Sequence, residues 1–273
     1  MTPTERTVTV TTVGGTTFAE RTDAVAMEEP LEIRVRTAST EPVSVAITMR
    51  TPDADGELAA GFLWSEGIVT DAAQIVSVSE GGAVQPGGFA NIVTLRLREM
   101  PPDISARQFY MTSSCGVCGK ASLEAIASRE PFPLRRGYPV WSPGVIHTLS
   151  DKLRAAQDTF DRTGGLHAAG LFDGEGVLVA VREDVGRHNA VDKIVGMALL
   201  SGELPLSDCL LFVSGRASFE LVQKAVMAGV PALAAVGAPS SLAVALAKDA
   251  GVTLLGFVRG ERFNIYANGD RIR

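Results

Sequence analysis

The two residues in this sequence best suited to chemistry are the closely spaced cysteines Cys115 and Cys118. A glycine follows each of them, so neighbouring side chains offer the sulfurs little cover. The segment after Lys120 has the apolar spacing of a helix, with Leu123 and Ile126 on one face. A helix N-terminus and a lysine charge both favour the thiolate form of cysteine. The pair is therefore predicted to be reactive.

The same cysteines could instead form a structural disulfide or half of a zinc site. A zinc site needs two more ligands at recognisable spacing, and the remaining candidates are scattered through the chain: Cys209, His147, His167 and His188. A chain of 273 residues does not need a disulfide staple, and its composition is not that of a secreted scaffold. We favour redox or sulfur-transfer chemistry and expect no permanent metal.

The composition limits the class of protein. Hydrophobic residues make up 46% of the chain and charged residues 21%, as in a globular protein with a buried core. A net charge of −6 argues against a non-specific nucleic-acid binder, yet it allows a local basic pocket. The uncharged stretch 230–247 is broken by Pro231 and Pro239, so we expect no membrane span. The first residues lack the apolar core of a signal peptide, and a cytoplasmic location is expected.

The order of elements predicts an α/β protein, α+β overall, with two domains. Residues 1–140 are predicted to form a smaller N-terminal α+β domain that ends in the cysteine loop and a proline-rich linker. In it we expect a ragged edge or short strand at 1–20, a helix capped by Thr51 with Pro52 in its first turn, and strands at 31–36, 43–50, 75–78 and 91–97.

Residues 141–273 alternate strands with helices, and several strands are almost wholly apolar. Such strands indicate a sheet that is buried on both faces, hence a layered α/β domain. We expect strands at 167–172, 177–181, 210–213, 230–236, 252–258 and 263–267, and helices at 151–160, 188–200, 217–228 and 241–250.

Small residues, hydroxyls and arginines follow successive strands of this domain. Ligands of open α/β sheets bind beyond the carboxyl ends of strands. Glycine lets a ligand approach the backbone, helix N-termini offer free N–H groups, and arginine binds phosphate with two hydrogen bonds. Any one arginine is explained as a surface residue, but several at equivalent strand ends predict a pocket for a phosphorylated ligand, such as a nucleotide. The candidate residues are Arg187, His188, Ser214, Gly215, Arg216, Arg259 and Arg262.

The histidines have two readings each. His188 opens a helix, with Asp184 before it and Asp192 four residues on along the same face. It could cap the helix, or it could transfer protons and orient a ligand. His167 begins an apolar strand and suits the core as well as a site. Cys209 precedes a buried strand and is expected to be an inert core cysteine.

Three motifs together resemble the FdhD family of formate dehydrogenase accessory sulfurtransferases: 115–119, 183–193 and 214–224. The resemblance runs from about Glu28 to the end of the chain. It implies a cytidine-deaminase-like, three-layer C-terminal domain, although the zinc signature of the deaminases is absent. It also implies a homodimer.

The resemblance further implies the activity. A cysteine desulfurase would donate persulfide sulfur, and the chain would pass it to the molybdenum cofactor, in its bis-guanine dinucleotide form, during maturation of formate dehydrogenase. Cys115 would carry the persulfide and Cys118 would be its partner. The family's cofactor-binding stretch maps onto Phe257, Val258, Arg259, Gly260, Glu261 and Arg262. Two other hypotheses remain: a non-catalytic chaperone that binds the molybdenum cofactor, and a zinc-bound regulatory domain.

Overall fold

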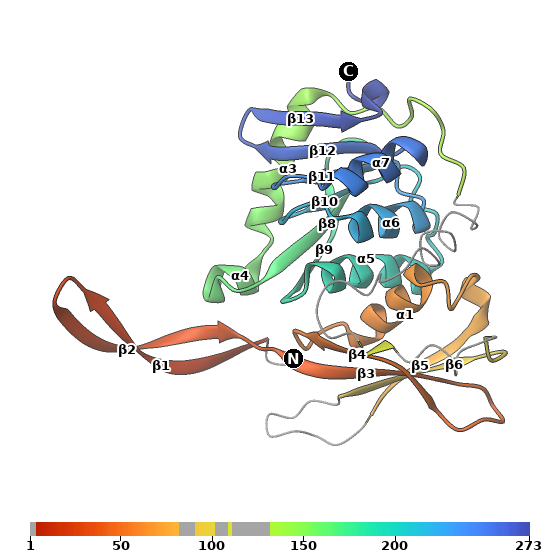
Figure 1. The fold of residues 1–273 in the computed structure, drawn as a ribbon, viewed down its shortest axis with the longest axis horizontal. Coiled ribbons are helices and arrows are strands. Elements are labelled where there is room, and N and C mark those ends of the chain that lie inside the picture. The colour runs from red at the N-terminus through yellow and green to blue at the C-terminus, as the bar shows by residue number, and fades with distance from the viewer. Residues whose placement is uncertain (1–3, 82–90, 102–108, 111–131) are drawn as a thin grey trace.

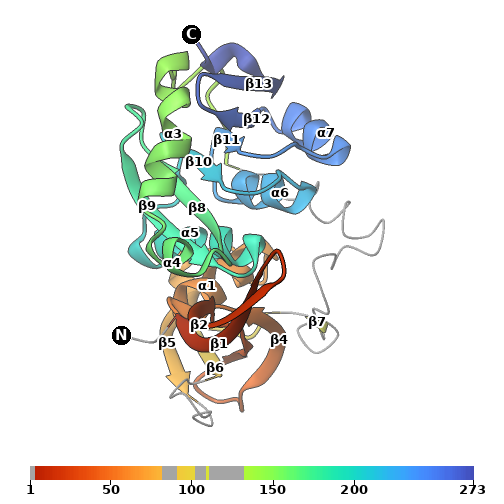
Figure 2. The same ribbon diagram turned by 90° about the vertical axis from the view of Figure 1, so that its left-hand side faces the viewer.

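Two sheets joined by a pair of crossed helices form the body of the molecule, and a two-stranded ribbon projects from it (Figures 1 and 2). The computed structural model describes residues 4–81, 91–101, 109–110 and 132–273. The ribbon consists of β1 (Glu5–Gly14) and β2 (Thr17–Ala26), which pair along their whole length. Of the two alternatives expected for 1–20, the strand is confirmed and the ragged edge is wrong, because a two-residue turn at Gly15 and Thr16 joins β1 to β2 in a hairpin.

The N-terminal sheet has the strand order β5-β6-β3-β4-β7. Its strands are β3 (Glu29–Arg36), β4 (Val43–Arg50), β5 (Ile75–Gly81), β6 (Ile92–Leu97) and β7 (Phe109–Tyr110). β3 and β4 are antiparallel, as the alternating pattern and the Glu41-Pro42 turn predict. The short 3-10 helix η1 (Ala72–Gln74) precedes β5. Helix α1 (Asp55–Ser65) covers the buried face of this sheet.

Helix α1 begins later than expected. Its N-cap is Ala54, in the left-handed conformation at φ 53°. Thr51 does not cap the helix, because its buried hydroxyl donates to the carbonyl oxygen of Met27 at 2.9 Å. The Thr51 hydroxyl is therefore not available to cap the helix, as the local sequence predicts that it should be.

The C-terminal sheet has the order β13-β12-β11-β10-β8-β9. Its strands are β8 (His167–Phe172), β9 (Leu178–Asp184), β10 (Leu210–Val213), β11 (Ala232–Ala235), β12 (Thr253–Arg259) and β13 (Arg262–Ala267). The strands β10, β11 and β12 are parallel, whereas β8 is antiparallel to both β9 and β10, and β13 to β12. The 3-10 helix η3 (Gly269–Arg271) lies near the C-terminus.

Helices cover both faces of this sheet (Figure 2). On one face lie α5 (Arg187–Ser201), α6 (Phe219–Met227) and α7 (Ser241–Asp249), and on the other lies α3 (Pro143–Ala155), followed by the short α4 (Asp158–Thr163). The expected layered α/β arrangement is thus present. The expected helix at 151–160 is wrong in its start, because Ser142 caps α3 and Pro143 occupies the first turn.

One hydrophobic cluster continues from the N-terminal sheet into the C-terminal layers. It contains Leu31 and Ile33 of β3, Leu58 of α1, Val191 of α5 and Leu221 of α6, each at most 1% exposed. Both sheets therefore pack against the same central helices, and α1 and α5 form the seam between them (Figure 1).

Candidate functional site

The carboxyl ends of β9, β10, β11 and β12 meet at one edge of the C-terminal sheet. β8 begins at this edge, since His167 pairs with Asp184 at the end of β9. β13 also begins there, since Arg262 pairs with Arg259. The prediction that the strand-end residues share one edge is confirmed.

Two glycines let the backbone loops at this edge stack closely. The amide of Gly237 donates to the carbonyl oxygen of Gly215 at 2.9 Å, and the amide of Phe257 donates to that of Gly237 at 3.1 Å. A Cβ on Gly237 would lie 3.0 Å from both the Gly215 oxygen and Cγ of Arg216. Phe257 has φ 55°, a conformation that a bulky residue rarely adopts. The edge is thus a tightly packed backbone surface, which a ligand could approach closely.

Arg187, His167 and Gly215 lie together at one end of the edge. A Cβ on Gly215 would be 3.5 Å from Nδ1 of His167 and 4.0 Å from Cδ of Arg187. Burial lowers the pKa of His167, and the charge of Arg187 lowers it further. The Nε atom of Arg187 is buried and has no hydrogen-bond partner among the described residues. Arg187 is also the first residue of α5, where the helix dipole disfavours a cation. An anion bound here would accept a hydrogen bond from Nε of Arg187. Its negative charge would also offset the unfavourable interaction of the arginine with the helix dipole.

The other arginines extend this positive charge along the edge. Arg216 follows β10 and is exposed, and Arg259 and Arg262 lie exposed at the turn between β12 and β13. The guanidinium of Arg259 lies 5.8 Å from the ring centroid of Phe257. Four strand intervals separate β8 from β13, a span of about 19 Å at ~4.8 Å each. A row of this length suits an extended ligand with several phosphates better than a single phosphate.

Several predicted site residues have mainly structural contacts. Val258 is fully buried in a second hydrophobic cluster, which includes Ile146 and Leu149 of α3, so its side chain does not face a ligand. The Ser214 hydroxyl accepts a hydrogen bond from the amide of Ala168 at 2.9 Å. Gly260 has φ 54° and, with Glu261, forms the exposed turn after β12. The predicted site residues therefore fall into two groups. Val258, Ser214 and Gly260 stabilise the strand ends and turns, whereas the exposed arginines can contact a ligand.

His188 faces α6 from the first turn of α5. Its Nε2 atom is 3.3 Å from the Ser218 hydroxyl and 3.5 Å from Oε2 of Glu220. Burial lowers the pKa of His188 to about 4, and the charges of Lys224 and Arg187 act in the same direction. The imidazole is therefore neutral at pH 7 and can accept or donate a hydrogen bond.

Asp192 does not act on His188, although the two residues share a helical face. It forms a buried ion pair with Lys224, whose Nζ is 2.8 and 2.9 Å from the two carboxylate oxygens. Ser65 of α1 also donates to Asp192, at 2.9 Å. Desolvation raises the pKa of this carboxyl, while Lys224 opposes that shift. This cluster ties α1, α5 and α6 together beneath His188.

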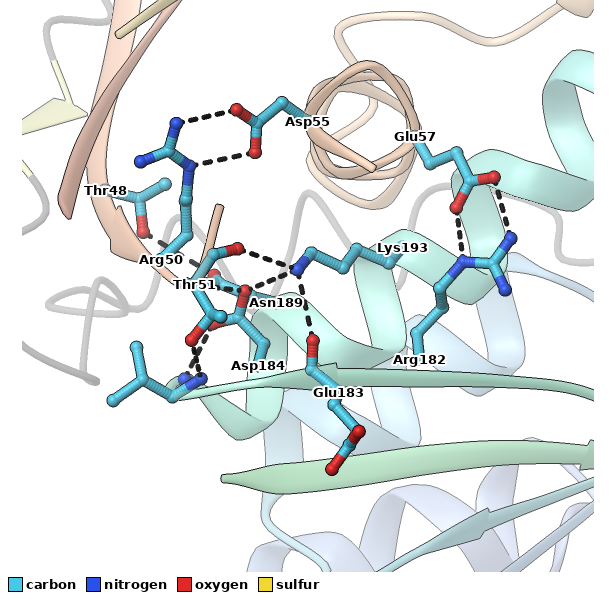
Figure 3. Close-up of polar contacts among 12 residues, drawn as sticks. Thr48, Arg50, Thr51, Asp55, Glu57, Arg182, Glu183, Asp184, Asn189 and Lys193 are labelled. Atoms are coloured by element: carbon cyan, nitrogen blue, oxygen red, sulfur yellow. Dashed lines mark hydrogen bonds and ion pairs between the residues drawn. The ribbon is translucent and has the colours of Figure 1, made fainter. Parts of the chain in front are cut away.

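A second buried network fixes the turn from β9 into α5 (Figure 3). Asp184 is fully buried and accepts hydrogen bonds from the amides of Thr51 and Gly186 and from the side chain of Asn189. Its other partner is Lys193, whose Nζ lies 2.8 Å away and also donates to the carbonyl oxygens of Thr51 and Glu183. The network therefore joins the N-terminal sheet to the turn that presents Arg187.

Two further ion pairs flank this network at the same seam. Arg50 donates to both carboxylate oxygens of Asp55, at 2.8 and 2.6 Å, and Arg182 of β9 donates to both oxygens of Glu57 in α1. The pairing of Asp184 with Lys193 was not predicted from the sequence. A signal for such a pair was present in the sequence of the helix 187–201. This helix is largely apolar, and its polar residues Asn189, Asp192 and Lys193 occupy positions that the structure buries.

Cys115 and Cys118 lie outside the described residues, as do Lys120 and the helix expected after it. Cys209 is a free, half-buried thiol, and burial raises its pKa to about 11, in line with the expected inert role. Among the described residues, no group of three or more histidine, cysteine or acidic side chains could hold a metal ion. No helix in this part of the chain is long and apolar enough to cross a membrane.

Comparison with known proteins identifies the class to which this fold and site belong. Residues 26–273 match the FdhD/NarQ family, and the chain belongs to that family. It is 55% identical to the sulfur carrier protein FdhD of Streptomyces avermitilis over 92% of this chain and 90% of the relative. The sulfur carrier protein FdhD of Mycobacterium tuberculosis is 48% identical over 92% of each chain.

A solved structure shares the whole fold. The crystal structure described as a formate dehydrogenase accessory protein from Desulfotalea psychrophila superposes with a TM-score of 0.76 at 25% identity. The match covers 99% of this chain and 100% of that one. The resemblance stated from the three sequence motifs is thus confirmed at the level of the family.

Proposed function

We propose that this protein is a sulfurtransferase that accepts persulfide sulfur from a cysteine desulfurase and delivers it to the molybdenum cofactor for formate dehydrogenase. The cofactor, in its bis-guanine dinucleotide form, is cargo rather than a resident group. Family membership and the sulfur-carrier relatives support the general role. The finer fold proposal is a deaminase-type C-terminal domain, which the three-layer arrangement supports.

The observation on which this proposal rests is the buried Nε of Arg187, which has no partner among the described residues and lies at one end of an arginine row. Phosphate oxygens are the natural partners of an arginine Nε–H that no described residue accepts from. Gly215 and Gly237 let the backbone loops pack closely between Arg187 and the exposed arginines of the β12–β13 turn. A ligand with two nucleotide arms supplies several phosphates along such a row, so the residues present fit the cargo.

The last residues described before Cys115 belong to the N-terminal sheet. β7 pairs in parallel with β4, with Tyr110 opposite Ile47. The next residues of β4 reach the site, because the carbonyl oxygen of Met49 accepts from Asn189 of α5 at 2.8 Å. Four residues lie between Tyr110 and Cys115, and the five Cα–Cα steps that join these two residues span at most about 18 Å. This tether supports a role for Cys115 near the arginine row.

The reaction assigned to Cys115 consists of two sulfur transfers. Its thiolate attacks the outer sulfur of the donor's persulfide, and the donor leaves as a thiolate while Cys115 becomes the persulfide. Cys118 then attacks the inner sulfur, sulfide leaves toward the cofactor, and a Cys115–Cys118 disulfide remains. A later reduction by a thiol restores both cysteines.

Intact-protein mass spectrometry tests the first transfer. The full chain is incubated with a cysteine desulfurase and cysteine, and the modified peptide is mapped. We expect one added sulfur on the Cys115 peptide, removable by a thiol reductant and absent in Cys115→Ala. Cys209→Ala is the matched control and should load normally, since its thiol is poorly ionised.

A failure to load sulfur would favour the second candidate, a non-catalytic chaperone of the cofactor. Guanosine diphosphate binding, measured by calorimetry, tests the arginine row separately. Arg216→Gln should weaken binding about tenfold, the loss of roughly one charge-assisted contact, whereas Arg21→Gln in the distant ribbon should leave it unchanged. Binding without sulfur loading would support the chaperone, and loading without binding would contradict the assigned pocket.

A further inference from the structure

A cluster of arginines lies on the face of the N-terminal sheet that points away from α1. Leu95 and Leu97 of β6 are at most 2% exposed and belong to the hydrophobic cluster shared with α1, so Arg96 between them points to the opposite face. Arg36 of β3 is the strand partner of Arg96 and is exposed, as is Arg98 just after β6. In the described part of the chain no helix covers this face (Figure 1).

These three residues, the sheet-face arginines, have no carboxylate partner among the described residues. The carboxylate of Glu32 on the same face already pairs with Arg34 at 2.6 Å. Arg98 donates from Nε to the carbonyl oxygen of Ala73, which is uncharged. The Nε atom of Arg96 is buried and has no hydrogen-bond partner in the described ranges. In a chain of net charge −6, this face therefore carries uncompensated positive charge.

The positions of the sheet-face arginines favour a bound anion. Like charges directly opposite each other destabilise a sheet, and a buried donor without an acceptor adds a further cost. Ser77 of β5 is the strand partner of Arg96 on its other side, so a hydroxyl and two guanidinium groups form one row across three strands. A carboxylate seated on this row would accept the hydrogen bond from Arg96 and reduce its repulsion with Arg36. The planar guanidinium group suits carboxylates, which it binds with two hydrogen bonds.

This face lies at the opposite end of the N-terminal sheet from the arginine row of the C-terminal sheet. Val43 at the start of β4 pairs with Val35, the neighbour of Arg36. The other end of β4 reaches the row, where the carbonyl oxygen of Met49 accepts from Asn189. Six residues of strand separate these two ends, a distance of about 20 Å. A partner on the sheet-face arginines therefore does not occupy the surface proposed for the cofactor.

The sheet-face arginines lie within reach of the reactive cysteine. Tyr110 is the strand partner of Ile47, which in turn pairs with Glu32 of β3. Arg36 is four residues further along β3 and two strand intervals from β7, about 17 Å from Tyr110 by the usual strand spacings. The chain from Tyr110 to Cys115 spans up to about 18 Å. A protein seated on this face can thus be approached by Cys115.

We propose that the sheet-face arginines dock the sulfur donor, a cysteine desulfurase, through an acidic segment of its surface. This inference rests on the proposed function and adds to it the surface that the donor recognises. The donor occupies one end of the N-terminal sheet and the cofactor occupies the arginine row at the other, so the two partners do not compete.

Binding of a cysteine desulfurase to the full-length Cys115→Ala protein, measured by biolayer interferometry, tests the docking surface. The substitution removes the sulfur acceptor, so docking is measured whether or not sulfur is transferred. The Kd should rise with sodium chloride concentration, because the contacts are exposed ion pairs. Arg36→Glu in the same background should raise the Kd at least tenfold. Arg6→Glu is the matched control, since it makes the same charge change at an exposed position of the ribbon and should leave the Kd unchanged.

Thermal unfolding supplies a second measurement that needs no partner. Arg36→Glu replaces a like charge beside Arg96 with an opposite one and should raise the unfolding temperature. An unchanged or lower temperature would show that the two guanidinium groups do not repel each other, and would remove the physical basis of the proposal.

The binding results separate this inference from the proposed function. No binding of the desulfurase, or equal weakening by Arg36→Glu and Arg6→Glu, would overturn the docking surface. If the unmodified chain still loads sulfur in that case, the sulfurtransferase function stands without it. Binding that Arg36→Glu alone weakens, in a chain that loads no sulfur, would support the docking surface and contradict the proposed function.

Discussion

Gly61 of α1 and Gly196 of α5 meet where the two helices cross, with no room for a side chain between them. A Cβ on Gly61 would lie 1.9 Å from the carbonyl oxygen of Asp192, and one on Gly196 would lie 1.8 Å from that of Glu57. Both neighbours are backbone atoms, which cannot rotate away. The seam between the two sheets therefore requires glycine at both positions.

Gly61→Ala should destabilise the protein strongly for this reason. The helices must separate by more than an ångström, and overpacking of this kind costs about 1–3 kcal/mol or more. Gly144→Ala is the matched control in helix α3, because its Cβ would meet only the Ser142 hydroxyl at 3.7 Å. That variant should be neutral or slightly more stable, since alanine favours a helix. Urea unfolding of the two variants gives the comparison, and equal stabilities would contradict the tight crossing.

Asp192→Asn should also be costly, because it leaves the ammonium of Lys224 buried without a carboxylate. Removing one partner of a buried ion pair costs about 3–5 kcal/mol. The matched control is Glu32→Gln, which removes the partner of Arg34 in a partly exposed pair, with side chains 23% and 34% exposed. Its cost should stay within about 1 kcal/mol. The denaturant midpoints of the two variants give the comparison. Similar losses of stability in both would show that the Lys224 site is not desolvated.

His188 should make the protein less stable in acid. Its pKa is lowered to about 4 in the fold, whereas an unfolded histidine titrates near 6.5. As the pH falls below 6.5, the unfolded chain binds a proton that the folded chain excludes, so stability is lost progressively until about pH 4. The loss attributable to this group reaches about 3 kcal/mol.

The direct measurement is a histidine NMR titration, with the His188 signal assigned by His188→Gln. A midpoint near 4 is expected for that signal. In the same variant, the part of the stability loss between pH 6.5 and pH 4 that comes from His188 should disappear. A midpoint near 6.5 in the wild type would mean that the imidazole of His188 is not buried beside Lys224 and Arg187.

Arg187→Gln should raise the pKa of both His167 and His188. The charge of Arg187 lowers each of them, next to the larger effect of burial, so its removal acts on both in the same direction. Arg216→Gln is the control, because Arg216 is not among the charges that shift either group. The same NMR titration reads both signals. A shift of only one histidine would contradict the shared position of Arg187 between them.

The alternation of strands and helices, the antiparallel pair β3–β4 and the common edge of the arginines could be predicted from the sequence. These features depend on local periodicity and on a general rule of sheet connectivity, both of which a single chain displays. A strand within 1–20 was one of two alternatives, but its pairing with β2 was not predicted because the alternating threonines and valines of the ribbon bury no face. The start of α1 was misplaced because Thr51 bonds to Met27 across the fold.

Three short motifs that combine in one chain were enough to indicate the family, and the strand pattern located the residues at the strand ends. Which charges pair could be learned from the packed fold alone. Asp192 could reach His188 along its own helix, yet it binds Lys224 of α6, because a buried carboxylate needs a cation and α6 brings one within 2.8 Å. In the same way, the packing around Arg187 leaves its Nε without a partner in the part of the chain that the structure describes. Such pairings depend on distances between segments far apart in the chain, which local patterns do not encode.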